Sequence, residues 1–143
     1  EAGLRGCKSW AKNHYDEYVN SGVETVVLCV DTLTDREYLR VYNKDMTGTV
    51  KNNQQFSQLV MDASKDAGHD DIELSSVFFG SSDAAAFSQA GITATCLAAM
   101  DPRPADYYHN RRDTADRLVP ETIKTGFDVI ISTILNFDEK GLN

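Results

Sequence analysis

The stretch Val23-Glu24-Thr25-Val26-Val27-Leu28-Cys29-Val30 is rich in β-branched residues and almost wholly apolar, and it runs directly into Asp31. Such a run is typical of a β-strand buried on both faces, as in the parallel sheets of α/β domains. A carboxylate at the C-terminal end of a buried strand lies where these folds place reactive side chains. The position alone leaves two interpretations of Asp31 open, a functional carboxylate or a turn or capping residue.

Helices and strands alternate on both sides of this strand. We predict helices over residues 4–19, 52–67 and 84–90, and a last helix that starts within 116–120 and closes at Lys140-Gly141. Further strands are predicted over residues 37–43, 72–79 and 92–99. The last helix has apolar residues that lie on one face, namely Ile123, Phe127, Ile130, Ile131, Ile134 and Leu135. This order predicts a three-layer α/β/α domain with a mixed, mostly parallel sheet.

Composition excludes several classes of partner. The chain has 143 residues, 41% of them hydrophobic, which suits one compact domain. Its formal charge of -8 argues against nucleic acids and anionic membrane surfaces as partners. The longest apolar runs are far shorter than the ~20 residues that span a bilayer. Cys7, Cys29 and Cys96 have no metal-like spacing, so we interpret them as buried free thiols.

An irregular polar run, Tyr107-Tyr108-His109-Asn110-Arg111-Arg112-Asp113-Thr114, follows the strand over residues 92–99. Pro102 and Pro104 just upstream disfavour a regular element, so the run is predicted to be a loop beyond a buried strand. His109 has two interpretations, a solvated histidine or one with metal or proton chemistry. Ser82 and Asp83 are predicted at a helix N-terminus, where capping is the simplest role.

Three stretches, in order, carry a resemblance. Glu1-Ala2-Gly3-Leu4-Arg5-Gly6-Cys7-Lys8 is similar to a Glu-Glu-x-Gly-Leu-x-Gly-Ser segment without its first glutamate. Leu28-Cys29-Val30-Asp31 is similar to a strand that ends in Asn-x-Asp. The stretches 82–87 and 108–114 are similar to the pair Ser-Asp-His-x-x-Phe and Tyr-His-Thr-x-x-Asp-Thr, with Ala84 in place of the first histidine. Together they resemble the co-catalytic dizinc aminopeptidases of the bacterial leucyl aminopeptidase and aminopeptidase Y group, metallopeptidase family twenty-eight.

The resemblance implies a zinc exopeptidase fold and a role for each matching residue. Glu1 and His109 would bind one zinc ion and Asp31 the other, with a metal-bridged water attacking the N-terminal peptide bond of a peptide substrate. Tyr108 would donate a hydrogen bond to the developing oxyanion. The ligands would be held in place by Asp83, Asp113 and Thr114.

The family's site also needs an upstream histidine, a bridging aspartate and a general-base glutamate, which would precede Glu1. We therefore expect residues 1–143 to be the C-terminal portion of a catalytic domain, incomplete on its N-terminal side. The parent protein would be the metallo-aminopeptidase, with two zinc ions, and this chain would be inactive alone. An exposed sheet edge would then favour self-association.

Two other functions stay open. The chain can be a non-catalytic binding or dimerisation module of the same fold, which an upstream His-x-Asp pair and a glutamate before Glu1 would argue against. A serine hydrolase is the third interpretation, but Ser82 lacks the Gly-x-Ser-x-Gly elbow and only Asp113 is a candidate acid partner for His109.

Overall fold

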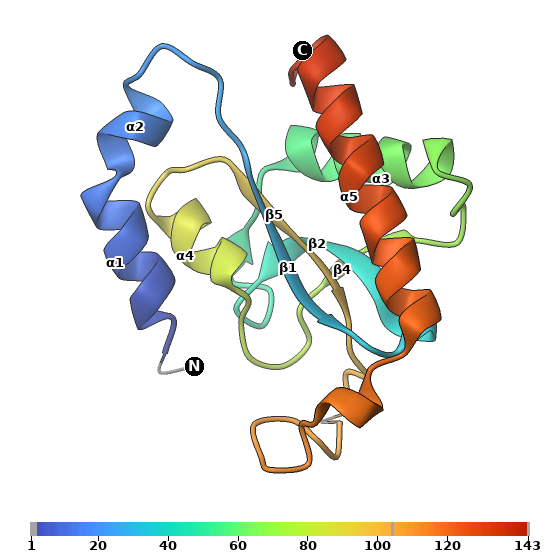
Figure 1. The fold of residues 1–143 in the computed structure, drawn as a ribbon. Coiled ribbons are helices and arrows are strands. Elements are labelled where there is room, and N and C mark those ends of the chain that lie inside the picture. The colour runs from blue at the N-terminus through green and yellow to red at the C-terminus, as the bar shows by residue number, and fades with distance from the viewer. Residues whose placement is uncertain (1–2, 104, 143) are drawn as a thin grey trace.

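The computed structural model describes residues 3–103 and 105–142, in which helices lie on both sides of one sheet (Figure 1). The helices are α1 (Arg5–Asn13), α2 (Tyr15–Val19), α3 (Gln54–Asp66), α4 (Asp83–Gln89) and α5 (Pro120–Lys140). The strands are β1 (Val27–Leu33), β2 (Leu39–Asp45), β3 (Val50–Lys51), β4 (Glu73–Ser76) and β5 (Ala94–Ala99), and two short 3-10 helices cover Arg36–Tyr38 and Ala115–Arg117. In these residues no helix is long and apolar enough to cross a membrane.

The sheet is mixed, as predicted. Its order is β1-β5-β2-β3, and β4 also pairs with β2. The pairs β1·β5 and β2·β4 are parallel, whereas β2 runs antiparallel to both β5 and β3. All six residues of β5 are buried, because β5 lies between two strands and under helices on both faces. The central strand β5 therefore has the buried character that the sequence assigned to residues 23–30.

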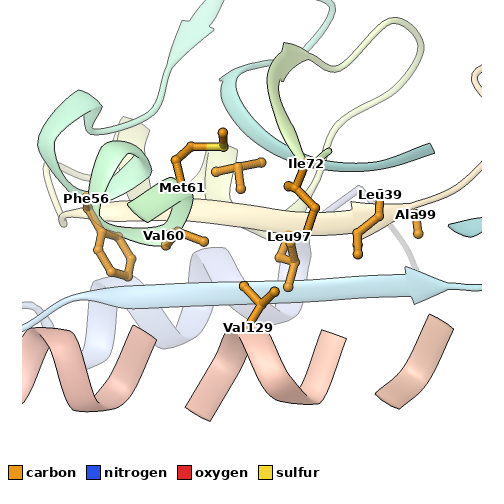
Figure 2. Packing of buried hydrophobic residues seen from close by; sticks show 9 residues of the cluster. Leu39, Phe56, Val60, Met61, Ile72, Leu97, Ala99 and Val129 are labelled. Carbon is orange, nitrogen blue, oxygen red and sulfur yellow. The ribbon is translucent and has the colours of Figure 1, made fainter. Parts of the chain in front are cut away.

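Two apolar clusters hold the layers together. On one face, α3 and α5 pack on the sheet around Phe56, Val60, Leu97 and Val129, which are all fully buried (Figure 2). On the other face, α1 and α4 pack on the sheet through smaller residues such as Ala11, Ala84 and Cys96. Either Asn52 or Asn53 suits the cap of α3 by residue type, and Asn53 is the cap, since its side chain accepts a hydrogen bond from the Phe56 backbone N–H at 2.8 Å.

The first predicted strand differs from the structure in extent and in burial. It begins at Val27 rather than Val23, and it continues through Asp31 to Leu33. Within the described residues β1 pairs only with β5, so it forms one edge of the sheet, and Val30 is 42% exposed. The sequence pattern predicts that β1 is buried on both faces, but the described residues do not cover it in this way.

The last helix, α5, buries small residues and exposes most of its large apolar ones. Its buried residues are Thr122, Thr125, Gly126, Val129 and Thr133. A Cβ on Gly126 would lie 2.5 Å from Leu33 Cδ1, so the glycine permits a close approach of α5 to β1. Ile123 and Ile130 are half-buried, whereas Phe127, Ile131, Ile134 and Leu135 are exposed, Leu135 by 63%. Within the described residues, most of the apolar face that the sequence indicates is therefore exposed.

Other boundaries moved by a few residues. The first predicted helix is interrupted at His14 and forms two separate helices, α1 and α2. The predicted strand over residues 37–43 is shifted to Leu39–Asp45, because residues 36–38 form a 3-10 turn. The strand over residues 72–79 is limited to Glu73–Ser76, and β3 was not predicted. The helix over residues 84–90 and the strand over residues 92–99 are confirmed to within two residues.

Candidate functional site

A cavity of about 500 Å³ gathers the predicted site residues of three distant segments. Asp31 comes from the end of β1, Asp83 from the first turn of α4, and Tyr108 and His109 from the loop after β5. The other lining residues are Gly3, Leu4, Cys29, Val30, Gly80, Ser81, Ser82 and Phe87. Because β1 and β5 are parallel, their C-terminal ends meet at the same edge of the sheet, where this cavity opens.

A β-bulge sets the position of Asp31. Asp31 pairs with Ala98 and Leu33 with the next residue, Ala99, so Thr32 is an extra residue in the strand. Thr32 has a φ of 45°, which is strained for a β-branched residue. Its Oγ1 donates a hydrogen bond to Asp31 Oδ1 at 2.8 Å. The bulge and this hydrogen bond hold the Asp31 carboxylate at the exposed end of the strand.

A buried carboxylate, Asp45, anchors the turn that carries Ser82 and Asp83. Asp45 is fully buried and accepts hydrogen bonds from the Ser82 backbone N–H at 2.9 Å and from the Ser82 hydroxyl. Ser82 in turn caps α4, with its Oγ accepting from the Ala84 N–H. The capping interpretation of Ser82 is thus confirmed, and Asp83 follows it in the first turn, on the cavity wall.

The loop after β5 places Tyr108 and His109 side by side. Their rings stack, with centroids 4.0 Å apart and an interplanar angle of 13°. His109 has a φ of 52°, an uncommon conformation for a residue other than glycine. Opposite the loop, a Cβ on Gly80 would lie 3.2 Å from the Tyr108 hydroxyl, so the glycine leaves room for that oxygen. The exposed imidazole of His109 and the half-buried phenol of Tyr108 both line the same cavity as Asp31 and Asp83.

Tyr107 ties this loop to the body of the domain. It is buried, and its hydroxyl donates a hydrogen bond to Asp35 Oδ2 at 2.8 Å. The same carboxylate oxygen accepts the Asp101 backbone N–H at 3.0 Å, so both ends of the loop are anchored on one side chain. Burial and the hydrogen bond to Asp35 raise the pKa of Tyr107.

Two cysteines lie beside the acidic side of the cavity. Cys7 Sγ donates a hydrogen bond to Asp83 Oδ1 at 3.1 Å. Burial, then the hydrogen bond and charge of Asp83, raise the pKa of Cys7 to about 11. Burial, then the charge of Asp83, raise the pKa of Cys29 to about 12. Both are protonated free thiols at neutral pH; they are half-buried, whereas only Cys96 is fully buried as the sequence suggested.

The remaining predicted site residues do not line the cavity or lie outside the described residues. Glu1 lies outside the described residues. Asp113 and Thr114 are exposed, and the Thr114 hydroxyl donates to the Arg112 carbonyl oxygen at 3.3 Å. The Asp113 N–H donates to the Asn110 carbonyl oxygen at 3.1 Å. These contacts brace the loop that carries His109.

The donor types at the cavity suit zinc, but their number does not complete a site. Carboxylate oxygen and imidazole nitrogen, as in Asp31 and His109, are ordinary zinc ligands. Within residues 3–103 and 105–142, however, no three His, Cys, Asp or Glu side chains are grouped so as to hold a metal ion. Zinc sites have three or four protein ligands, so further donors are required beyond the described ones.

Sequence reasoning missed Asp45, Tyr107 and the position of Cys29 in the site. Asp45 lies within a polar stretch that is typical of a loop, and its partner Ser82 is 37 residues away. Tyr107 gave no signal beyond its place next to Tyr108. Cys29 is two residues before Asp31, so the alternation of a strand places these two side chains on the same face.

Comparisons with known proteins bear on the family of the chain. The model of peptidase family M28 matches residues 1–134. No curated protein matches the chain.

Solved structures resemble the fold at low sequence identity. The LapA aminopeptidase of Legionella pneumophila is 16% identical, with a TM-score of 0.75 over 94% of this chain and 36% of that chain. BSAP, a zinc aminopeptidase from Bacillus subtilis, is 20% identical, with a TM-score of 0.67 over 97% of this chain and 33% of that chain. This chain therefore spans about a third of the length of these aminopeptidases, and the likeness shows the α/β fold.

Proposed function

Because the chain belongs to peptidase family M28, we propose that it forms the C-terminal portion of the catalytic domain of a zinc-dependent aminopeptidase. The observation that carries this proposal is the shared cavity of Asp31, Asp83, Tyr108 and His109, from three segments of the chain. The substrate is a peptide, cleaved at its N-terminal bond. The other two thirds of a complete aminopeptidase of this fold supply the missing ligands and the general base.

Each residue of the cavity has a proposed role. Asp31 and His109, with Glu1, bind the two zinc ions. Zinc, when bound, supplies a Lewis acid that polarises the carbonyl group of the scissile bond. Tyr108 donates a hydrogen bond from its hydroxyl to the oxyanion that develops there, and Gly80 leaves space for that hydroxyl.

The supporting residues keep the proposed ligands in place. Asp83 lies on the cavity wall and accepts the Cys7 thiol proton in a hydrogen bond, so its carboxylate is oriented rather than free. Asp113 and Thr114 brace the loop of His109 and act at a distance from the cavity. We assign all three to the orientation of the zinc ligands.

The proposal predicts zinc-dependent hydrolysis by a longer protein that includes residues upstream of Glu1, and none by the 143-residue chain. The p-nitroanilides of leucine and of glutamate, the latter joined through its α-carboxyl group, serve as substrates. The longer protein is expected to lose its activity after treatment with a chelator and to regain it with zinc. Measurable zinc-dependent turnover by the 143-residue chain would show that its site is complete, and a longer protein inactive with zinc would favour the non-catalytic module.

We also propose that the 143-residue chain, by itself, pairs with a second copy through the edge of β1. Next to this edge, a cavity of about 690 Å³ lies against α5 and is lined by apolar residues such as Val23, Leu28 and Ile134. The neighbouring surface of α5 exposes Phe127, Ile131 and Leu135. An open strand edge beside a large apolar surface favours association with another chain.

Light scattering is expected to show a dimer or a larger species at high concentration. Ile134 is 56% exposed, so Ile134→Lys is expected to shift the chain towards the monomer without a loss of packing. Ser9→Lys, at an exposed position of α1, is the control for the single added charge. A chain that stays monomeric at high concentration would contradict the pairing.

A further inference from the structure

A second cavity, of about 570 Å³, has an arginine on its wall and lies beside the candidate site. Its lining consists of Tyr38, Arg40, Tyr42, Ser75, Ser76, Phe78, Met100, Pro102 and Arg103. A small pocket of about 60 Å³ shares Tyr42, Phe78, Met100 and Pro102 with it, and is also lined by Asp31 and Tyr108. The second cavity therefore adjoins the site, with these shared residues between them.

Arg40 has no carboxylate partner in the described part of the chain. Its guanidinium makes one hydrogen bond, from Nη1 to the Leu39 carbonyl oxygen at 2.8 Å. The side chain is half-buried in a protein with 22 acidic and 14 basic residues. Glu73 is its register partner on β4, but that side chain is exposed and forms no ion pair with Arg40. A half-buried guanidinium without a counterion has unused capacity for a planar anion.

The rest of the lining suits a carboxylate on an aliphatic stem. The hydroxyls of Ser75 and Ser76 make only long hydrogen bonds, of 3.5 Å each, to backbone carbonyl oxygens. They therefore have donor capacity to give to a ligand. Phe78, which is 75% exposed, and Met100 supply apolar surface next to them.

The second arginine of this cavity is already engaged. Arg103 pairs with Asp101, Nη2 to Oδ2 at 2.8 Å, and also donates to the Tyr38 hydroxyl at 2.9 Å. Asp101 is thereby neutralised, so its charge opposes an incoming anion less. Of the two arginines, Arg40 is thus the one that is available to bind an anion.

From this arrangement we propose that the cavity recognises an acidic side chain, aspartate or glutamate, of the first residue of the peptide substrate. The proposal rests on the peptidase function of the neighbouring site and names the class of its substrate. Arg40 pairs with the side-chain carboxylate, Ser75 and Ser76 donate hydrogen bonds to it, and Phe78 and Met100 contact the methylene groups.

The test is the binding of small peptides to the 143-residue chain, because all lining residues belong to it. Titrations followed by the amide NMR signals of the protein compare Glu-Ala-Ala-amide with Gln-Ala-Ala-amide. A third peptide, Gln-Ala-Ala with a free C-terminus, shows whether a terminal carboxylate can replace the side-chain carboxylate. We expect Glu-Ala-Ala-amide to bind about tenfold more tightly than its glutamine analogue. The largest signal changes are expected at Arg40, Ser75 and Phe78.

The matched variants are Arg40→Gln and Arg36→Gln, which change the net charge equally. Arg36 pairs with Asp71 at 2.8 Å and does not line the cavity. Arg40→Gln is expected to abolish the preference for glutamate, Arg36→Gln to leave it intact, and Arg40→Lys, which keeps the charge, to retain part of it. The amide spectrum of each variant reports whether it is folded.

Three outcomes would overturn the assignment: equal affinity for the glutamate and glutamine peptides, no binding of either peptide, or a preference for the peptide with a free C-terminus. Binding requires neither zinc nor turnover, so these outcomes do not depend on the peptidase proposal. A chain that prefers glutamate although the longer protein never hydrolyses peptides would refute the function and keep the acidic-side-chain site.

Discussion

Replacing Asp45 with alanine is expected to lower the free energy of unfolding by about 3 kcal/mol, a large part of the ~5 to 15 kcal/mol typical of a domain. The carboxylate is fully buried and accepts the backbone N–H groups of Ser82 at 2.9 Å and of Met46 at 2.8 Å. It also accepts the Ser82 hydroxyl and, at 3.4 Å, the Asn52 amide. Alanine would leave the buried N–H and hydroxyl of Ser82 without this acceptor, whereas the Asn52 amide keeps the Tyr42 carbonyl oxygen.

Urea unfolding measures this effect, as a lower transition midpoint at an unchanged slope. Asp70→Ala is the control, because Asp70 is exposed, and we expect a change within about 0.5 kcal/mol. The loss of unfolding free energy for Asp45→Asn is expected to lie between those of Asp45→Ala and Asp70→Ala, since the amide keeps the shape but has only one acceptor oxygen. An Asp45→Ala protein as stable as the wild type would mean that Asp45 does not anchor the Ser82 turn.

The sequence predicted the order of elements and the edge of the sheet where the site lies. These features depend on local patterns: the apolar run of β5, the cap at Asn53, and the break before α4. Asp31, Asp83, Tyr108 and His109 line one cavity, as expected if strand ends and helix starts meet at one edge.

Other features depend on contacts that no local pattern encodes. Gly126 lies against Leu33, so α5 buries mainly small residues, whereas Ile131 and Ile134 are exposed. The apolar pattern over residues 23–30 implies burial, but Val30 is exposed because β1 has a neighbour on one side only within the described chain. The bulge at Thr32 and the anchor at Asp45 arise from pairings between segments distant in the sequence.

Replacing His109 with alanine is expected to lower the affinity of the longer protein for one of its two zinc ions by at least about a hundredfold. The estimate is a lower bound, because changes to residues that merely orient a metal ligand cost about 10- to 100-fold. His69→Ala is the matched control. His69 pairs with Asp128 at 3.3 Å and is not among the residues that line the site cavity.

The zinc content of the protein, by elemental analysis together with zinc titration, tests the central claim most directly. The measurement compares the 143-residue chain, a version extended upstream of Glu1, and the extended version with His109→Ala. We expect two zinc ions per extended chain, one after His109→Ala, and fewer than two in the 143-residue chain. If neither the chain nor its extended form binds zinc tightly, the loop around His109 is structural and the chain is a non-catalytic module of this fold.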